Sequence, residues 1–181
     1  MSLPASVEGR AHLRLFCGLR LPDDVLDRVE RWQHDHLAGR TIARENLHIT
    51  LAFLGSRPHE DVEKVASALE SMPALEPMLF RARRYRETRS VGMVVLEDLT
   101  GEATRAAEQL HERLDRLGVY EQESRRWLPH LTVLRFRERP GLEPPAPDLG
   151  TFSPSEAAVY HSVLRPTGAQ YEVLETVALG G

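Results

Sequence analysis

Two short segments of this sequence carry the same combination of side chains suited to acid–base chemistry. The first reads HITL at residues 48–51, and the second reads HLTV at residues 130–133. Histidine titrates near neutral pH and can give or take a proton, and a threonine hydroxyl can hold a phosphate oxygen. One His-x-Thr segment would be incidental in most chains, so the repetition is the informative feature.

Both segments alternate as β-strands do, in the runs NLHITLAFLG and LPHLTVLRFR. Residues i and i+2 of a strand share a face and lie ~6.6 Å apart. His48 and Thr50 therefore share one face, and so do His130 and Thr132. If both faces line one cleft, a neutral histidine can take a proton from water while a protonated one gives a proton to the leaving oxygen. The two hydroxyls would hold the non-bridging phosphate oxygens, and the pattern thus favours phosphate chemistry.

Other uses of two histidines fit the sequence less well. A zinc site usually needs a third ligand at short spacing, and no Cys, Asp or Glu stands beside either motif. The chain has no HExxH helix, no G-x-S-x-G elbow, and no Walker A or GxGxxG loop. We therefore expect neither a metal nor a cofactor.

Composition sets the class of protein. The 181 residues are 41% hydrophobic and 28% charged, which predicts one globular domain spanning residues 1–181. No apolar run is long enough for a secretory signal or a membrane span, and a single cysteine, Cys17, indicates a reducing cytoplasm. The net charge of −4 argues against bulk binding to nucleic acid. Of the 23 basic residues, Lys64 is the only lysine and the others are arginines. We attribute this preference for arginine to coding bias. The alternative is that some of the arginines bind phosphate through their planar guanidinium groups.

Periodicity and turn residues outline the secondary structure. They predict helices over residues 25–37, 62–72 (before Pro73) and 103–117, and strands over 12–21, 46–55, 76–87, 91–99, 127–136, 157–165 and 169–179. Each histidine strand follows a helix that itself follows a strand, and no linker separates independent domains. The expected fold class is α+β, with sheets covered by helices on their outer faces.

The motifs also resemble those of a known family. NLHITLAFLG and PHLTVLR are similar to the two signature motifs of the two-histidine phosphoesterases, and within them to the RNA 2′,3′-cyclic phosphodiesterases, formerly called 2′-5′ RNA ligases. RLFCGLRLPDDV resembles the first strand and helix start of that family, and VYHSVLRPTGAQYEVL resembles its closing hairpin. The resemblance thus spans nearly the whole chain.

The resemblance implies a fold and an activity. The fold would be bilobal, with two antiparallel-type sheets around a central cleft, helices on the outer faces and halves related by a pseudo-twofold axis. The activity would be metal-independent opening of an RNA 2′,3′-cyclic phosphate end to a 2′-phosphomonoester, with weak reverse 2′-5′ ligation. We expect no membrane partner, and we favour a monomer, although the sequence leaves the oligomeric state open. The alternatives are a phosphoesterase acting on a small cyclic phosphate, such as an ADP-ribose derivative, and a non-catalytic RNA-end binding protein.

The resemblance also implies roles for particular residues. These are catalysis by His48 and His130, phosphate binding by Thr50, Thr132 and Arg135, and base stacking by Phe53. Phe53 and Arg135 each stand five residues after their histidine, so a regular strand would point them away from the cleft. A bulge or a strand end must re-aim both. Our working assignment makes His48 the acid beside O3′ and His130 the base for water.

The sequence departs from the family at two positions near the motifs. Leu128 stands where the family often has an arginine, and the run MVVLED lacks a tryptophan often found there, which puts the substrate wall in doubt. The arginines between residues 81 and 89 alternate only partly, which favours a solvated sheet edge, with guidance of RNA as the alternative. His111 is expected to be exposed on the helix over residues 103–117.

Overall fold

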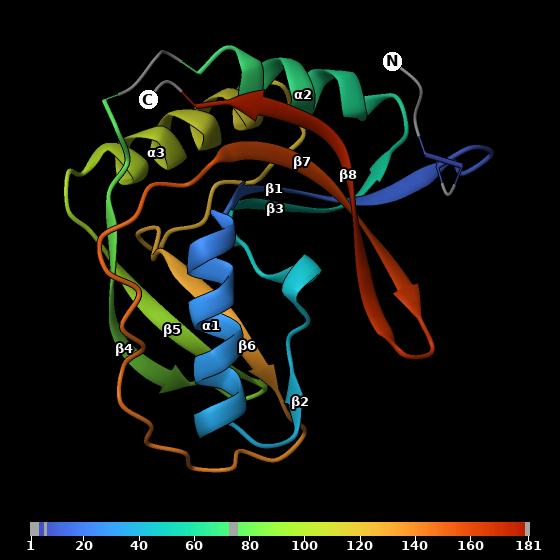
Figure 1. The fold of residues 1–181 in the computed structure, drawn as a ribbon. Helices are drawn as coiled ribbons and strands as arrows, with labels where there is room; N and C mark the ends of the chain where they lie inside the picture. The colour runs from blue at the N-terminus through green and yellow to red at the C-terminus, as the bar shows by residue number, and fades with distance from the viewer. Residues whose placement is uncertain (1–3, 6, 73–75, 180–181) are drawn as a thin grey trace.

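The elements follow the predicted order in the computed structural model, which describes residues 4, 5, 7–72 and 76–179 (Figure 1). They are β1 (His12–Arg20), α1 (Asp23–His36), β2 (Arg40–Thr41), the 3-10 helix η1 (Arg44–Asn46), β3 (Ile49–Pro58), α2 (Asp61–Glu70), β4 (Phe80–Glu87), β5 (Val91–Asp98), α3 (Glu102–Arg116), β6 (His130–Arg135), β7 (Glu156–Arg165) and β8 (Gly168–Ala178). The short β2 and η1 were not predicted, since segments of two and three residues carry no periodicity. The predicted stop of the second helix at Pro73 lies outside the described residues.

The strands form one antiparallel sheet in the order β4-β5-β6-β3-β1-β7-β8, with β2 beside β6. The α+β class is therefore confirmed. The prediction of two separate sheets is wrong, because β3 pairs with β6 and makes the sheet continuous. Among the described residues this junction is one residue pair, Ile49 with Leu131, and the two sides of the curled sheet diverge from it.

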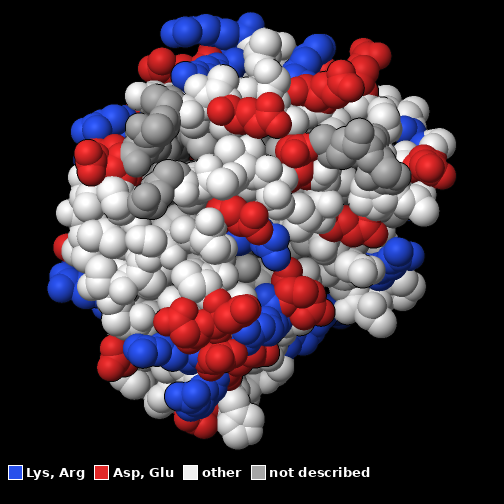
Figure 2. All heavy atoms as spheres, turned by 45° about the horizontal axis from the view of Figure 1, so that its top comes forward, with Lys and Arg blue, Asp and Glu red and all other residues white. Residues whose placement is uncertain are grey.

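The helices lie on one face of the curled sheet. α1 lies in front of β5 and β6 and contacts β6 through Gln33, while α2 and α3 lie together over the strands β1, β3 and β7 (Figure 1). Trp32 of α1 lies 6.0 Å from Tyr85 of β4, measured between ring centroids. Among the described residues, no helix is both long enough and apolar enough to span a membrane. On the face shown in Figure 2, acidic and basic side chains are interspersed.

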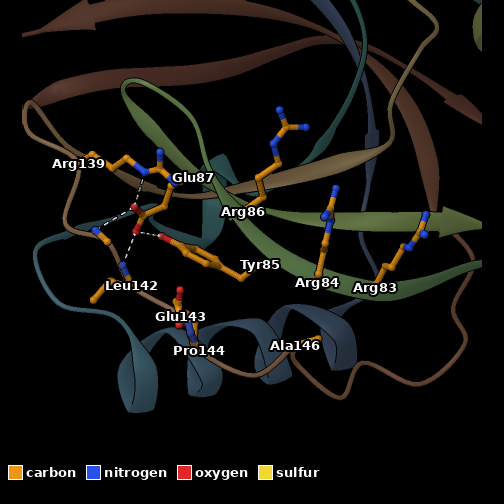
Figure 3. A pocket seen from close by; sticks show the side chains of 11 residues that line it. Arg83, Arg84, Tyr85, Arg86, Glu87, Arg139, Leu142, Glu143, Pro144 and Ala146 are labelled. Atoms are coloured by element: carbon orange, nitrogen blue, oxygen red, sulfur yellow. Dashed lines mark hydrogen bonds and ion pairs between the residues drawn. The ribbon is translucent and has the colours of Figure 1, made fainter.

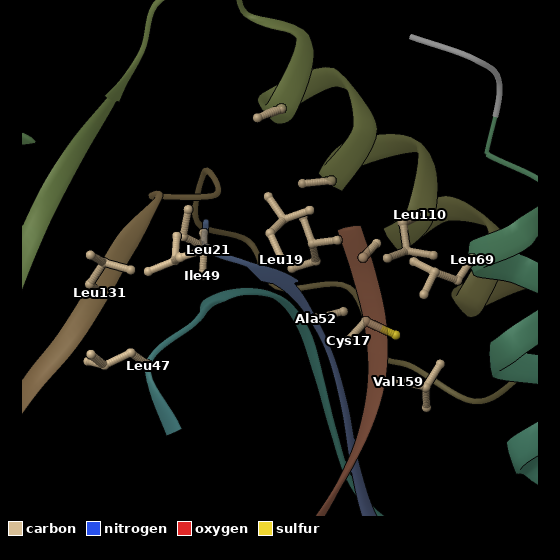
Figure 4. Close-up of a cluster of buried hydrophobic side chains, with 14 of the residues drawn as sticks. Cys17, Leu19, Leu21, Leu47, Ile49, Ala52, Leu69, Leu110, Leu131 and Val159 are labelled. Carbon is tan, nitrogen blue, oxygen red and sulfur yellow. The ribbon is translucent and has the colours of Figure 1, made fainter. Parts of the chain in front are cut away.

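The apolar residues of the two motifs are part of the core under the helices. Ile49 and Leu131 are fully buried in one cluster with Cys17 and Leu110 (Figure 4). Burial of these alternate residues fixes the register of both strands, because a slip by one residue would turn the core side chains to the other face. The histidines and threonines must then face the side of the sheet that the helices leave open.

Candidate active site

The pairing of β3 with β6 brings the two motifs together. Ile49 lies opposite Leu131 in an antiparallel register. The residue before one then faces the residue after the other, so His48 lies opposite Thr132 and His130 opposite Thr50. The predicted convergence of two imidazoles and two hydroxyls on one face is therefore confirmed, while their roles stay predictions.

The same local contact orients both imidazoles. Nδ1 of His48 donates to the carbonyl of Asn46 at 2.8 Å, and Nδ1 of His130 donates to the carbonyl of Leu128 at 2.9 Å. A neutral ring that keeps its proton on Nδ1 presents an unprotonated Nε2. In His48 this atom lies 2.9 Å from the Thr50 hydroxyl, which donates to it. Leu128 acts here through its backbone, so the departure from the family at this position leaves the contact intact.

Three aromatic rings surround His48 on the side away from β6. Ring centroids of Phe16, Tyr160 and Tyr171 lie 4.8, 5.7 and 5.3 Å from the His48 ring. The side chain of Asn46 fixes the nearest part of β8, because its oxygen accepts from the Tyr171 N–H at 3.3 Å and its amide donates to the β8 backbone. Sequence reasoning missed these residues, and the only local signal was alternation in the closing hairpin.

Gly18 of β1 leaves the room that the His48 ring occupies. It pairs with Thr50 on the same face of the sheet. A Cβ atom at Gly18 would lie 3.3 Å from His48 Cδ2, 3.3 Å from Tyr160 Cε2 and 3.2 Å from the Ile49 carbonyl oxygen. These distances are tighter than ordinary van der Waals contacts. Any side chain at position 18 would therefore contact the His48 ring too closely and displace it.

Burial lowers the pKa of His48 to about 4, against the opposing effect of its bond to the Asn46 carbonyl. The charges of His130 and Arg135 lower this pKa further. At pH 7 the imidazole of the free protein is therefore neutral, in the form that accepts a proton at Nε2.

This lowered pKa predicts a pH dependence of stability. Between its ordinary value of 6.5 and about 4, His48 is protonated in the unfolded chain and neutral in the fold, so the unfolded state binds more protons. The free energy of unfolding must therefore fall as the pH drops through this window. In urea unfolding, His48→Gln should lose less stability than the wild type between about pH 7 and pH 5. His34→Gln, at an exposed site, is the control, and equal losses in all three proteins would contradict the prediction.

Each motif is followed by a bulge that shifts the alternation of side chains. The register of β3 against β1 skips Leu51, and the register of β6 against β5 skips Val133. Both skipped residues stand third after their histidine. The shift returns Phe53 and Arg135 to the histidine face, as the sequence analysis required. The Phe53 ring then stacks 6.5 Å from that of Phe16 and is 50% exposed.

Arg135 lies at one end of the site. Its Nη2 atom is 3.5 Å from the Tyr171 hydroxyl, and its charge acts on His48. Arg40 of β2 pairs directly with Arg135, which places a second guanidinium at this end. Sequence reasoning missed Arg40 because β2 is too short to be recognised. Across the described residues, no group of three or more His, Cys, Asp or Glu side chains is arranged to hold a metal ion.

Polar side chains from two helices bind the bulges. Gln33 of α1 donates through Nε2 to the Val133 carbonyl at 2.9 Å, and His111 of α3 donates through Nε2 to the Leu51 carbonyl at 2.7 Å. The prediction of an exposed His111 is therefore wrong, since its ring is partly buried and hydrogen-bonded. Both helices thus hold the backbone that re-aims Phe53 and Arg135.

Removing the donor at the second bulge should weaken both stability and phosphate binding. Gln33 is 4% exposed and also donates to the Ile42 carbonyl at 3.1 Å. Gln33→Met keeps the length of the side chain but removes both bonds. The Val133 carbonyl still accepts from the Ile42 N–H at 3.0 Å, so the Ile42 carbonyl bears most of the loss, which should cost about 1–3 kcal/mol of unfolding free energy. The KM should rise because Arg135 loses its support. Gln122→Met, in an exposed loop, is the control, and equal behaviour in urea unfolding and kinetics would refute the role of Gln33.

The fold and the paired motifs together define a class of protein. The sequence model of the 2′-5′ RNA ligase superfamily matches residues 21–166, and the chain belongs to this superfamily. Its relatives include the RNA 2′,3′-cyclic phosphodiesterase of Escherichia coli, at 30% identity over 92% of this chain and 96% of the relative. A protein of the same name from Methanocaldococcus jannaschii is 23% identical over 90% of this chain and 99% of its own.

Solved structures agree with this assignment. The crystal structure of E. coli LigT in apo form aligns with a TM-score of 0.78 at 26% identity, over 95% of this chain and all of that one (100%). A Thermus thermophilus protein aligns with a TM-score of 0.80 at 26% identity, over 93% of this chain and 99% of that one. The likeness extends over more than nine tenths of this chain in both cases.

Proposed function

We propose that residues 1–181 form one phosphoesterase domain that hydrolyses the 2′,3′-cyclic phosphate at an RNA end to a 2′-phosphomonoester. The observation that carries the proposal is the pairing of Ile49 with Leu131, which sets each histidine opposite the threonine of the other motif. The names of the E. coli and M. jannaschii relatives support the substrate.

In the proposed reaction water attacks phosphorus in line with the departing ribose oxygen. The bond from phosphorus to O3′ breaks as the bond to the water oxygen forms. One histidine takes the proton from water, and the other gives a proton to O3′. Thr50, Thr132 and Arg135 donate to the non-bridging oxygens and balance their charge.

The surroundings of the two histidines favour His48 as the acid. The exposed Phe53 and the partly exposed Tyr171 lie on the His48 side of the site, where a nucleobase can stack, and the buried Phe16 packs behind both rings. Stacking there places the ribose, and so O3′, beside His48. In-line attack then brings water from the opposite side, beside His130.

The low pKa of His48 is compatible with this assignment. An anionic phosphate within hydrogen-bond reach of the ring favours its protonated form. Substrate binding would therefore raise the pKa of His48 above its value in the free protein, so that the ring becomes protonated and can act as the acid. The same site could run 2′-5′ ligation, with a 5′-hydroxyl in place of water, but weakly because water is in large excess.

We further propose that the two halves of the chain are related by a pseudo-twofold axis passing between Ile49 and Leu131. Three equivalences support it: the Nδ1 bond of each histidine, the bulge three residues after it, and the helix side chain on the bulge carbonyl. The segment β5-α3-β6 would then correspond to β1-α1-β3. In this symmetry Phe53 and Arg135 occupy equivalent positions with different tasks.

Monomeric action in a reducing cytoplasm remains our proposal from the sequence. The buried, unpaired Cys17 supports the reducing compartment, because a free thiol inside the core suits one. Light scattering of the purified protein at working concentration would test the oligomeric state.

A turnover assay tests the proposed function. RNA ending in 2′,3′-cyclic phosphate should be converted to a 2′-phosphate end, with the rate unchanged in excess EDTA, because imidazoles and hydroxyls do the chemistry. Faster turnover of an ADP-ribose derivative that carries a cyclic phosphate would favour the small-molecule alternative. Tight binding of the RNA end without turnover would favour the non-catalytic binding protein. Loss of activity in EDTA, restored by zinc or manganese, would refute the mechanism.

A further inference from the structure

The edge strand β4 carries arginines that lie in the same cross-strand rows as the candidate catalytic residues. β5 lies between β6 and β4, and its Val95 pairs with His130 on one side and with Arg84 on the other. Residues paired across antiparallel strands share a face of the sheet. A second row on the same face consists of Thr132, Met93 and Arg86. Arg84 and Arg86 thus lie on the histidine face, two strand spacings or about 10 Å from β6.

Packing supports this orientation. Tyr85, between the two arginines, packs against Trp32 of α1 and so points to the helix side. Figure 3 shows the side chains of Arg83, Arg84 and Arg86 directed away from α1. The arginines therefore line the open face and not the core.

These arginines carry unneutralised charge. Within the described part of the chain, Arg83, Arg84 and Arg86 are exposed and form no hydrogen bond or ion pair, whereas Arg81 on the same strand pairs with Glu97 at 2.7 Å. They border a pocket of about 380 Å³ between β4 and the loop at residues 139–146. Its acids are Glu143, at the surface, and Glu87, which already accepts bonds from Tyr85, Arg139 and two backbone N–H groups.

The face of the sheet is therefore divided across the two histidines. The rings of Phe16, Phe53, Tyr160 and Tyr171 lie on the His48 side, where Arg14 of β1 packs 5.6 Å over the Phe53 ring, and the arginines of β4 other than Arg81 lie beyond His130 without a partner among the described residues. In-line attack puts the ribose on one of these sides and the nucleophile on the other. If the nucleoside stacks on the aromatic side, the arginines lie on the nucleophile's side.

We propose that Arg84 and Arg86 bind the phosphates of a second RNA strand, whose 5′-hydroxyl takes the place of water in the site. This inference rests on the proposed function and on His48 standing beside O3′. The 5′-hydroxyl oxygen attacks phosphorus and passes its proton to His130, while O3′ leaves with a proton from His48, so a 2′-5′ phosphodiester forms without a cofactor. Guanidinium forks suit the phosphates that follow the 5′-hydroxyl along this strand.

The test compares ligation with hydrolysis in the double variant Arg84→Gln with Arg86→Gln. Hydrolysis of 2′,3′-cyclic AMP should stay within about twofold of the wild type, because neither arginine lies within reach of the reacting phosphate. With a donor RNA ending in cyclic phosphate and an acceptor RNA with a 5′-hydroxyl, the ligated fraction should fall about tenfold. The salt slope for acceptor binding should drop by about 1.4, since each single-strand phosphate contact contributes about 0.7.

The control variant removes the same charge elsewhere. Arg105→Gln with Arg116→Gln alters exposed sites on α3 and should leave the ligated fraction unchanged. An unchanged fraction in the Arg84 and Arg86 variant would overturn the inference, as would a raised KM for hydrolysis of a long donor alone, which would assign the arginines to the donor strand. Wild-type hydrolysis without any ligation would also overturn it but leave the proposed function intact, whereas absence of hydrolysis would overturn the proposed function itself.

Discussion

His48→Ala and His130→Ala are each expected to lower kcat/KM on RNA 2′,3′-cyclic phosphate by at least about 10²-fold, the usual scale for one acid or base. The double variant should lose much less than the product of the two single losses, because acid and base act in one step. Initial rates of the three variants, measured on the same RNA, check both expectations.

His36→Ala, at an exposed site on α1, is the matched control and should keep wild-type activity. Circular dichroism and urea unfolding must show that each variant remains folded. A single variant of His48 or His130 with near-wild-type rate would remove that histidine from the mechanism. Strictly multiplicative losses would instead mean that the two act in separate steps.

The second large effect should come from the leaving oxygen. Sulfur in place of O3′ leaves as a stable thiolate and needs little help from an acid. With a 3′-thio cyclic substrate, His48→Ala should recover much of its lost rate, about 10²-fold, while His130→Ala should stay slow because water still needs a base. The ratio of rates on sulfur and oxygen substrates, measured for each variant, gives the result.

The outcome of this substitution also tests how the sugar is seated. Preferential recovery of His130→Ala would exchange the two roles and place the ribose on the β6 side. A 3′-phosphate product from the oxygen substrate would mean that O2′ leaves, and the assumed position of the nucleoside would be wrong. In either case the assignment of Arg84 and Arg86 to a second strand would fall with it.

Much of the fold was predictable because the pattern of apolar residues along each strand matches the face that the strand buries. Apolar residues alternate in the motif strands because one face packs under helices, and Ile49 and Leu131 mark that face in the sequence. The union of the strands in one sheet was not predictable. It depends on a single pairing between segments far apart in the chain, which no local periodicity records.

Some features of the candidate site were likewise predictable from the sequence, and others were not. His48 and His130 were recognisable from their repeated motif, and the need for a bulge followed from the positions of Phe53 and Arg135. The bonds that hold the bulges were not, because a glutamine or histidine on a helix looks solvated until its acceptor is known. His111 shows this most clearly, since its partner is a backbone carbonyl 60 residues away.

The crossing of the helices bears on how the molecule unfolds. α1 follows β1 in the chain yet lies over β6, to which Gln33 donates, and α3 follows β5 yet packs against β3 as well as β5 (Figure 1). Each half therefore contributes a helix that covers strands of the other half, so part of the apolar face of each half is buried against the other. The protein should melt in a single all-or-none transition, and fragments cut near residue 74 should acquire structure only when mixed.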